Sequence, residues 1–184
     1  QSIQINGIVE EAVRATSPRW KDESESSGRT IQIKTELGEV PPVQGRDSAI
    51  YDILINLLLN AVDAMPDGGA IFIQTKSGEG DVVLIFSDTG IGMREETRIR
   101  VFEPFFTTKA EVGTGLGLST VYNTVTKWGG SIEVDSKLEV GTTFTLRFPI
   151  WKEPEIPKEE PAIAIQTRPG KILIVEDDEN VKKF

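Results

Sequence analysis

An apolar segment crossed by one polar stripe constrains this chain more than any other feature of its sequence. Between Ser48 and Met65 nearly every residue is Ile, Leu, Val, Ala or Tyr, and the exceptions recur every three or four residues. The exceptions are Asp52, Asn56, Asn60 and Asp63. Residues at this spacing share one face of a helix, and a helix that is apolar elsewhere is mostly buried. Because an unpaired buried amide or carboxylate costs roughly 1–3 kcal/mol, the stripe needs partners: solvent, a hydrogen-bond network, or a ligand with polar atoms such as a metal-bound nucleotide.

The composition excludes several classes of protein. A net charge of −9 argues against non-specific binding to nucleic acid or to anionic membranes. With no cysteine there is no disulfide framework and no thiolate metal site, and no secretory signal or membrane-length apolar run is present, so we expect a cytoplasmic segment. The chain also contains no histidine, which removes imidazole bases, histidine metal ligands and a phosphohistidine from this segment.

The hydrophobic pattern predicts one domain over residues 1–150. Helical spacing is found at residues 3–16, 48–65, 94–101 and 116–128. Strands are predicted at residues 30–37, 70–76, 81–87, 131–136 and 142–148. Residues 21–28 are polar and predict a loop, whereas residues 77–80 predict a hairpin turn. This order favours an α+β two-layer sandwich, with helices on one face of a mixed sheet.

Two glycine-rich turns carry the clearest chemical signals. Asp88 leaves the end of a predicted strand and is followed by Gly90 and Gly92, so the backbone can approach a planar ligand while the carboxylate accepts a hydrogen bond from an exocyclic amine such as that of adenine. A tight turn explains this pattern equally well. The alternating glycines of residues 113–117 precede a predicted helix, and their N–H groups together with the helix dipole favour an anion. Phosphate binding and a flexible turn both fit this second motif.

The segment between the two turns is a candidate lid. It holds Phe102, Phe105, Phe106 and Lys109. A long excursion between two ligand-binding turns is typical of segments that close over a ligand. The aromatic cluster favours packing over base stacking. The Lys109 side chain can reach a terminal phosphate, although an exposed lysine is usually only solvated.

Taken in order along the chain, these motifs resemble the ATP-binding catalytic domain of sensor histidine kinases. The matching motifs are Asn-x-x-x-Asn, Asp-x-Gly-x-Gly, Phe-x-Pro-Phe-Phe, Gly-x-Gly-x-Gly-Leu and a final Gly141-Thr-Thr-Phe144. They correspond to the N, G1, F and G2 boxes of that family, which shares the Bergerat fold of gyrase, Hsp90 and MutL. The resemblance covers nearly all of residues 3–150 and implies this fold for the chain.

The resemblance implies a role for each matching residue. Asn56 and Asn60 would coordinate Mg²⁺ that bridges the phosphates of ATP, and Asp88 would recognise the adenine amine. The adenine site would be shaped by Gly90 and Gly92 and supported by Thr142. The phosphate contacts would come from Gly113, Thr114, Gly115, Leu116, Gly117 and Leu118. Residues 94–112 would form the mobile lid, with Lys109 near the phosphates.

One position departs from the family pattern, and another separates two reactions. Asp63 stands where many family members have lysine, so a role through water or metal is easier to defend than a direct phosphate contact. The hydrolytic branch of the fold has a glutamate general base at the position of Asn56, and an amide cannot take up that proton. We therefore expect transfer of the γ-phosphate to a histidine on a separate dimerisation domain. A GHKL-type ATPase and an inactive nucleotide-binding scaffold are the alternatives.

The last part of the chain predicts a different unit. Residues 151–170 are rich in proline and glutamate and predict a linker. Lys171–Glu179 resembles the first strand of a response-regulator receiver domain, in which Glu176 and Asp177 would help bind Mg²⁺; a strand that merely ends in acids is the alternative. A receiver start at residues 171–184 implies a hybrid kinase as parent. Its partners would be the dimerisation domain and a response-regulator receiver, and the isolated segment is expected to be monomeric.

Overall fold

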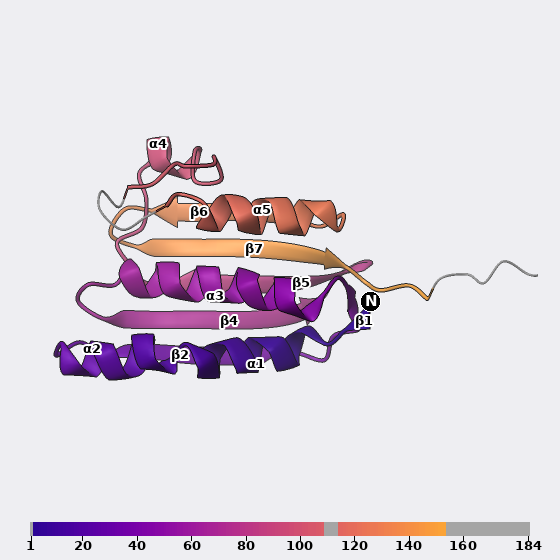
Figure 1. Cartoon of the computed structure of the whole chain (residues 1–184), viewed down its shortest axis with the longest axis horizontal. Helices are drawn as coiled ribbons and strands as arrows, with labels where there is room; N and C mark the ends of the chain where they lie inside the picture. The colour runs from indigo at the N-terminus through magenta and orange to yellow at the C-terminus, as the bar shows by residue number, and fades with distance from the viewer. Residues whose placement is uncertain (1, 109–113, 154–184) are drawn as a thin grey trace, which may run out of the picture. The chain divides into compact units, whose positions relative to one another are not determined.

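A mixed five-stranded sheet forms one layer of the fold (Figure 1). The computed structural model describes residues 2–108 and 114–153. The strands of this sheet are β2 Ile31–Leu37, β4 Gly69–Ser77, β5 Asp81–Asp88, β6 Ser131–Lys137 and β7 Gly141–Pro149. Their order is β2-β4-β5-β7-β6; β2 and β4 are parallel, and the other neighbours are antiparallel. The predicted hairpin at residues 77–80 and the mixed sheet are both confirmed.

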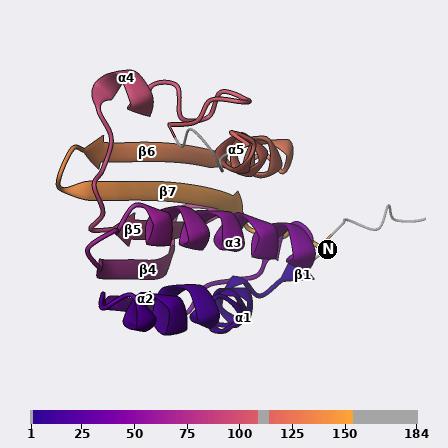
Figure 2. The same ribbon diagram turned by 60° about the vertical axis from the view of Figure 1, so that its left-hand side comes forward.

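Three longer helices cover one face of this sheet (Figure 1; Figure 2). They are α1 Ile5–Ala15, α3 Asp47–Asp63 and α5 Gly117–Lys127. The apolar side of α3 supplies Ile50, Ile53, Leu54, Leu57, Leu58, Ala61 and Val62 to the core. These side chains pack with inward-facing residues of the central strands, which include Leu84, Phe86, Leu146 and Phe148. Burial of this side leaves the polar stripe of α3 on its remaining face, as the spacing predicts.

The segment between α1 and β2 corrects one prediction. Residues 21–28 were expected to form a loop, but Pro18–Asp22 form a π-helical turn (η1) and Glu23–Ser26 form a short helix (α2). Polar composition hides these turns, because they are held by backbone bonds and by serine hydroxyls that donate to the Glu23 carbonyl, and not by an apolar face. A second small sheet, in which β1 Ser2–Ile3 pairs with β3 Val43–Gln44, also escaped the sequence pattern.

The layers bring several chain segments to one end of the sheet. The strand β5 ends at Asp88, directly opposite Thr142 near the start of β7. The helix α3 also ends at this end of the sheet, and the turn that follows it leads into β4 at Gly69. The helix α5 begins beside the last turns of α3 and ends near the beginning of α3, where the Trp128 ring lies against Gly45. All the predicted site residues within the described ranges therefore come from elements that meet at, or lead into, this end.

Candidate functional site

The amide pair of α3 faces the first turn of α5. Asn56 and Asn60 are both half-buried, and Asn56 Nδ2 donates to the Asp52 carbonyl oxygen at 2.8 Å. A Cβ atom placed on Gly117 would lie 2.7 Å from Asn56 Oδ1 and 3.9 Å from Asn60 Nδ2. A larger residue at position 117 would therefore have to displace the Asn56 amide. The bond to the Asp52 carbonyl fixes the amide of Asn56, so its Oδ1 atom is directed toward the N-terminus of α5.

Asp88 is the most buried charged side chain near this end of the sheet. It is 8% exposed, and its Oδ1 atom accepts a hydrogen bond from the Gly90 N–H at 2.8 Å. Burial raises the pKa of this carboxyl above its usual value, and backbone hydrogen bonds from Gly90 and Thr142 oppose the rise. A carboxylate held this way, at the end of a strand, is suited to accept a hydrogen bond from a ligand amine.

The loop after Asp88 is bonded to the end of α3. The Ile91 N–H donates to the Ala64 carbonyl at 2.9 Å, and a Cβ on Gly90 would lie 2.6 Å from the same oxygen. Gly92 has φ +62°, and a Cβ there would collide with the Lys137 carbonyl oxygen. Both glycines predicted to shape the site are therefore required by close backbone contacts. These contacts account for the glycine pattern without a ligand, and they leave Asp88 in a fixed position.

A hydroxyl network supports the Asp88 loop from the β6–β7 side. Thr142 is buried, and its Oγ1 atom lies 3.0 Å from Ser136 Oγ. Ser136 also donates to the Gly141 carbonyl and accepts from the Met93 N–H at 2.9 Å. The sequence motifs identified Thr142 but missed Ser136 and Ala64. No sequence signal marks them, because Ser136 acts through long-range hydroxyl bonds and Ala64 through its backbone carbonyl.

The segment after the Asp88 loop packs partly on the body of the fold. The short helix α4, Glu95–Arg98, confirms the expected helix, and Arg98 Nη1 donates to the Val134 carbonyl at 3.3 Å. The Phe102 ring packs at 5.4 Å from the Tyr122 ring and 6.4 Å from the Phe144 ring. Packing was therefore the right prediction for Phe102.

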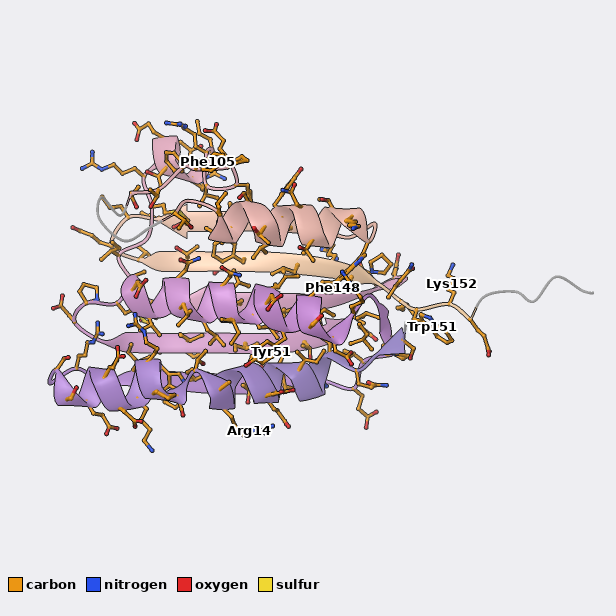
Figure 3. All side chains as sticks on the ribbon, viewed as in Figure 1. Arg14, Tyr51, Phe105, Phe148, Trp151 and Lys152 are labelled. Carbon is orange, nitrogen blue, oxygen red and sulfur yellow. The ribbon has the colours of Figure 1, made fainter. Side chains whose placement is uncertain are left out.

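The other two aromatic residues of this segment differ from each other. Phe106 packs with Arg100, whose guanidinium lies 4.3 Å from the ring centroid. Phe105 is 76% exposed and has φ +64°, and its N–H donates to the Gly115 carbonyl at 2.9 Å (Figure 3). Packing was thus the wrong prediction for Phe105, because its left-handed backbone turns the ring into solvent. The bond to Gly115 links the lid segment to the second glycine turn.

The remaining predicted residues fall in different places. Lys109 and Gly113 lie outside the described residues. Thr114 and Leu116 are exposed, while Leu118 packs on the core. Asp63 Oδ1 lies 3.0 Å from Arg19 Nη2, so this end of the stripe faces the segment between α1 and β2. The structure thus brings Asn56, Asn60, Gly117 and the Asp88 loop to one end of the fold.

The acidic residues in the described ranges do not form a metal cage. Nowhere within residues 2–108 and 114–153 do three carboxylates converge in a way that could hold a metal ion. Oxygen donors near the start of α5 come instead from amides. Mg²⁺ is often held by one or two protein ligands together with substrate phosphates, which is the arrangement that an amide pair allows.

Comparison with known proteins identifies the family. One family profile, described as "Histidine kinase-, DNA gyrase B-, and HSP90-like ATPase", matches residues 45–152. The chain belongs to this family. Its match covers the stripe of α3, both glycine turns and the final motif, so the resemblance predicted from the ordered motifs is confirmed. Within the family, the described residues form an ATP-binding catalytic domain of the sensor histidine kinase type.

Individual members of the histidine kinase group are also similar to this chain. Sporulation kinase E of Bacillus subtilis is 40% identical over 127 residues, which are 68% of this chain and 17% of that protein. The structure of full-length ShkA in complex with AMPPNP has a TM-score of 0.69 at 26% identity, over 84% of this chain and 32% of that one. The catalytic domain of histidine kinase ThkA has a TM-score of 0.68 at 25% identity, over 82% and 95%.

The family domain covers only part of such kinases. The chain spans 17% of the length of sporulation kinase E and 32% of that of ShkA. Among the helices of the described ranges, none is long and apolar enough to cross a membrane. The predicted receiver start at residues 171–184 lies outside the described residues, as does the predicted linker beyond Glu153.

Proposed function

We propose that this domain binds Mg²⁺-ATP at the shared end of α3, α5 and β5 and transfers the γ-phosphate to a histidine of a separate dimerisation domain. The observation that carries this proposal is the close approach of Gly117 to the Asn56 and Asn60 side chains. This approach brings the positive end of a helix dipole and an amide pair together, which suits phosphate and its metal ion. The similar ShkA structure contains AMPPNP, which supports an adenine nucleotide as the ligand.

Asp88 is proposed to recognise the adenine end of the nucleotide. Its carboxylate is buried and accepts backbone N–H groups, so its orientation is fixed before a ligand arrives. In its ionised form it is an acceptor only, which favours an exocyclic amine over a carbonyl. Discrimination between adenine and guanine follows, because guanine presents a carbonyl oxygen at the corresponding ring position.

The amide pair is proposed to hold the metal ion. The Nδ2 group of Asn56 is used by the Asp52 carbonyl, which leaves Oδ1 as the atom available to a cation. Asn60 lies one turn further along the same face of α3. Bound Mg²⁺ would neutralise charge on the phosphates. The residues of this chain would orient the phosphate tail against the start of α5 and exclude water from it.

Phosphate transfer is favoured over hydrolysis by the chemistry of Asn56. A neutral amide cannot act as a general base toward water at neutral pH. None of the side chains of this chain is a histidine, so the phosphate acceptor has to come from another domain. We propose the dimerisation domain of the parent kinase as that acceptor. A receiver domain that begins near residue 171 would be the next phosphate acceptor.

Calorimetric titration with ATP, in the presence and absence of Mg²⁺, tests the site. We expect Asn60→Ala to remove the Mg²⁺-dependent part of the affinity. Asn123→Ala, an exposed asparagine on α5, is the matched control and should bind as the wild type does. An Asn60→Ala variant that responds to Mg²⁺ like the wild type would rule out the metal assignment.

Phosphate transfer needs a second assay. The domain is mixed with labelled ATP and the histidine-bearing dimerisation domain of a similar sensor kinase. Label on that histidine supports the proposed reaction. Rapid release of free phosphate without the acceptor would instead support an ATPase, and tight ATP binding with neither reaction would support a scaffold.

A further inference from the structure

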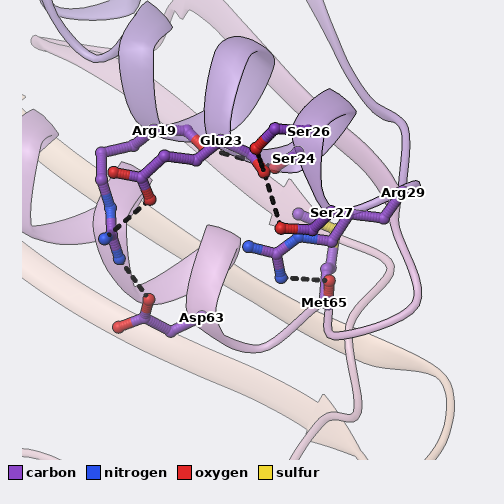
Figure 4. Close-up of polar contacts among 8 residues, drawn as sticks. All are labelled: Arg19, Glu23, Ser24, Ser26, Ser27, Arg29, Asp63 and Met65. Carbon is purple, nitrogen blue, oxygen red and sulfur yellow. Dashed lines mark hydrogen bonds and ion pairs between the residues drawn. The ribbon is translucent and has the colours of Figure 1, made fainter.

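Two arginines between α1 and β2 contact the residues on either side of Ala64 (Figure 4). Arg19 Nη2 lies 3.0 Å from Asp63 Oδ1, on the last residue of α3. Arg29 Nη1 donates to the Met65 carbonyl at 3.4 Å. Ala64 lies between these two contacts and receives the N–H of Ile91 on its own carbonyl. The arginines therefore hold the turn to which the Asp88 loop is bonded.

This turn also borders the first residue of β4. Met65 is 1% exposed, and its sulfur would lie 2.6 Å from a Cβ on Gly69. Thr89 Oγ1 accepts the Ala70 N–H at 3.0 Å and lies 4.0 Å from the Met65 sulfur. A shift of the α3 terminus would thus move both the Asp88 loop and the start of the neighbouring strand.

The support behind Arg19 is itself well bonded. Trp20 Nε1 donates to the Val13 carbonyl at 3.1 Å, which fastens η1 to α1. Ser24 is fully buried, and its hydroxyl donates to the Arg19 carbonyl at 3.2 Å. Glu23 Oε2 accepts from Arg19 Nη1 at 3.0 Å, so the guanidinium is held between two carboxylates. The side chain of Arg19 is therefore oriented toward α3 from a fixed base.

We propose that Arg19 is a positioning residue for nucleotide binding, acting through Asp63 on the end of α3 and the Asp88 loop. This inference rests on the proposed function, because it concerns the same site. It gives Asp63 the role of anchor for Arg19 in place of a contact with the nucleotide. Arg29 supports the same turn through the Met65 carbonyl.

The size of the effect is bounded by the strength of the contact. Both side chains of the Arg19–Asp63 pair are partly exposed, at 45% and 35%. Such partly exposed ion pairs contribute up to about 1 kcal/mol. A contact can change a ligand affinity only by the amount that its free energy differs between the free and the ligand-bound protein. We therefore expect Arg19→Gln to weaken nucleotide binding by up to about fivefold. ATP and ADP should be affected alike, since the contact acts at the adenine end.

A double-mutant cycle tests the proposal. MgADP and MgATP affinities are measured by calorimetry for Arg19→Gln, Asp63→Asn and the double variant, with Arg19→Lys as the conservative variant. Arg14→Gln is the matched control, because it removes an exposed ion pair within α1 that does not involve α3. Thermal midpoints are recorded for all variants, so that weaker binding can be separated from a general loss of stability.

The proposal predicts that the double variant binds no more weakly than either single variant, that Arg19→Lys binds more tightly than Arg19→Gln, and that Arg14→Gln binds as the wild type does. It is overturned if Arg19→Gln leaves the affinity unchanged. It is also overturned if Asp63→Asn weakens binding equally with and without Arg19, since Asp63 would then act directly. If Asn60→Ala responds to Mg²⁺ as the wild type does, the proposed function fails. That result is distinct from failure of this inference.

Discussion

Replacement of Asp88 by asparagine separates the ligand role of this residue from its structural role. The carboxylate is 8% exposed and accepts the Gly90 N–H at 2.8 Å. A hydrogen bond from adenine to an ionised carboxylate is worth about 1.5–3 kcal/mol. Its loss should weaken ATP binding by about ten- to hundredfold. The amide oxygen of the variant has two lone pairs and can still accept the backbone N–H groups, whereas its NH₂ group cannot accept a hydrogen bond from the ligand amine.

The pH dependence of the free energy of unfolding is a second, independent test of the role of Asp88. Burial raises the pKa of Asp88 in the folded state above the ordinary aspartate value of 3.8. Between that value and the raised pKa, the folded state binds more protons than the unfolded state. The contribution of Asp88 to stability is therefore fully present below pH 3.8 and is lost as the pH rises through the raised pKa. The Asp88→Asn variant lacks this loss.

Two measurements together test the reasoning on Asp88. Urea unfolding at a series of pH values should show the wild type losing stability relative to Asp88→Asn as the pH rises from 3.8. Calorimetry should show the weaker ATP binding, with Asp47→Asn at the exposed start of α3 as the control. A stability difference that does not change with pH, or unchanged ATP affinity in Asp88→Asn, would refute the account of this residue.

Two glycine substitutions test the close approaches around the site. Gly117→Ala would bring a Cβ to 2.7 Å from Asn56 Oδ1, so calorimetry should show Mg²⁺-ATP binding weakened by about tenfold or more. Because Gly117 is helical and has no positive φ, the thermal midpoint of this variant should be at or above that of the wild type. Gly92→Ala, with φ +62° and a collision with the Lys137 carbonyl, should lower the free energy of unfolding by about 1–3 kcal/mol or more. Gly7→Ala, where the space is open and α1 is helical, should instead raise it by up to about 1 kcal/mol.

Most of the layer structure could be predicted from the sequence because it rests on hydrophobic period. The stripe of α3, the alternation of β2 and the order of the later strands are local patterns. The helical turns of Pro18–Ser26 could not be predicted in this way, because their residues are polar and their bonds run to backbone carbonyls. The pairing of Ser2–Ile3 with Val43–Gln44 joins two-residue strands about forty positions apart, which no local period marks.

The candidate site was predictable to a similar extent. The glycines and amides form spaced motifs, and the structure places Gly117 close to Asn56. The supports of the site were not predictable. Ala64 acts through a carbonyl, Ser136 through bonds to Met93 and to the start of β7, and Arg19 through a residue 44 positions away. These contacts depend on the folded chain and not on the residue type alone.

Transfer of labelled phosphate from ATP to a histidine-bearing dimerisation domain distinguishes a kinase from an ATPase in one assay. The domain should label the histidine in a Mg²⁺-dependent reaction, and Asn60→Ala should lose this labelling while Asn123→Ala keeps it. Label that appears only as free phosphate, at the same rate with and without the acceptor domain, would contradict the claim that Asn56 makes this site a kinase and not an ATPase.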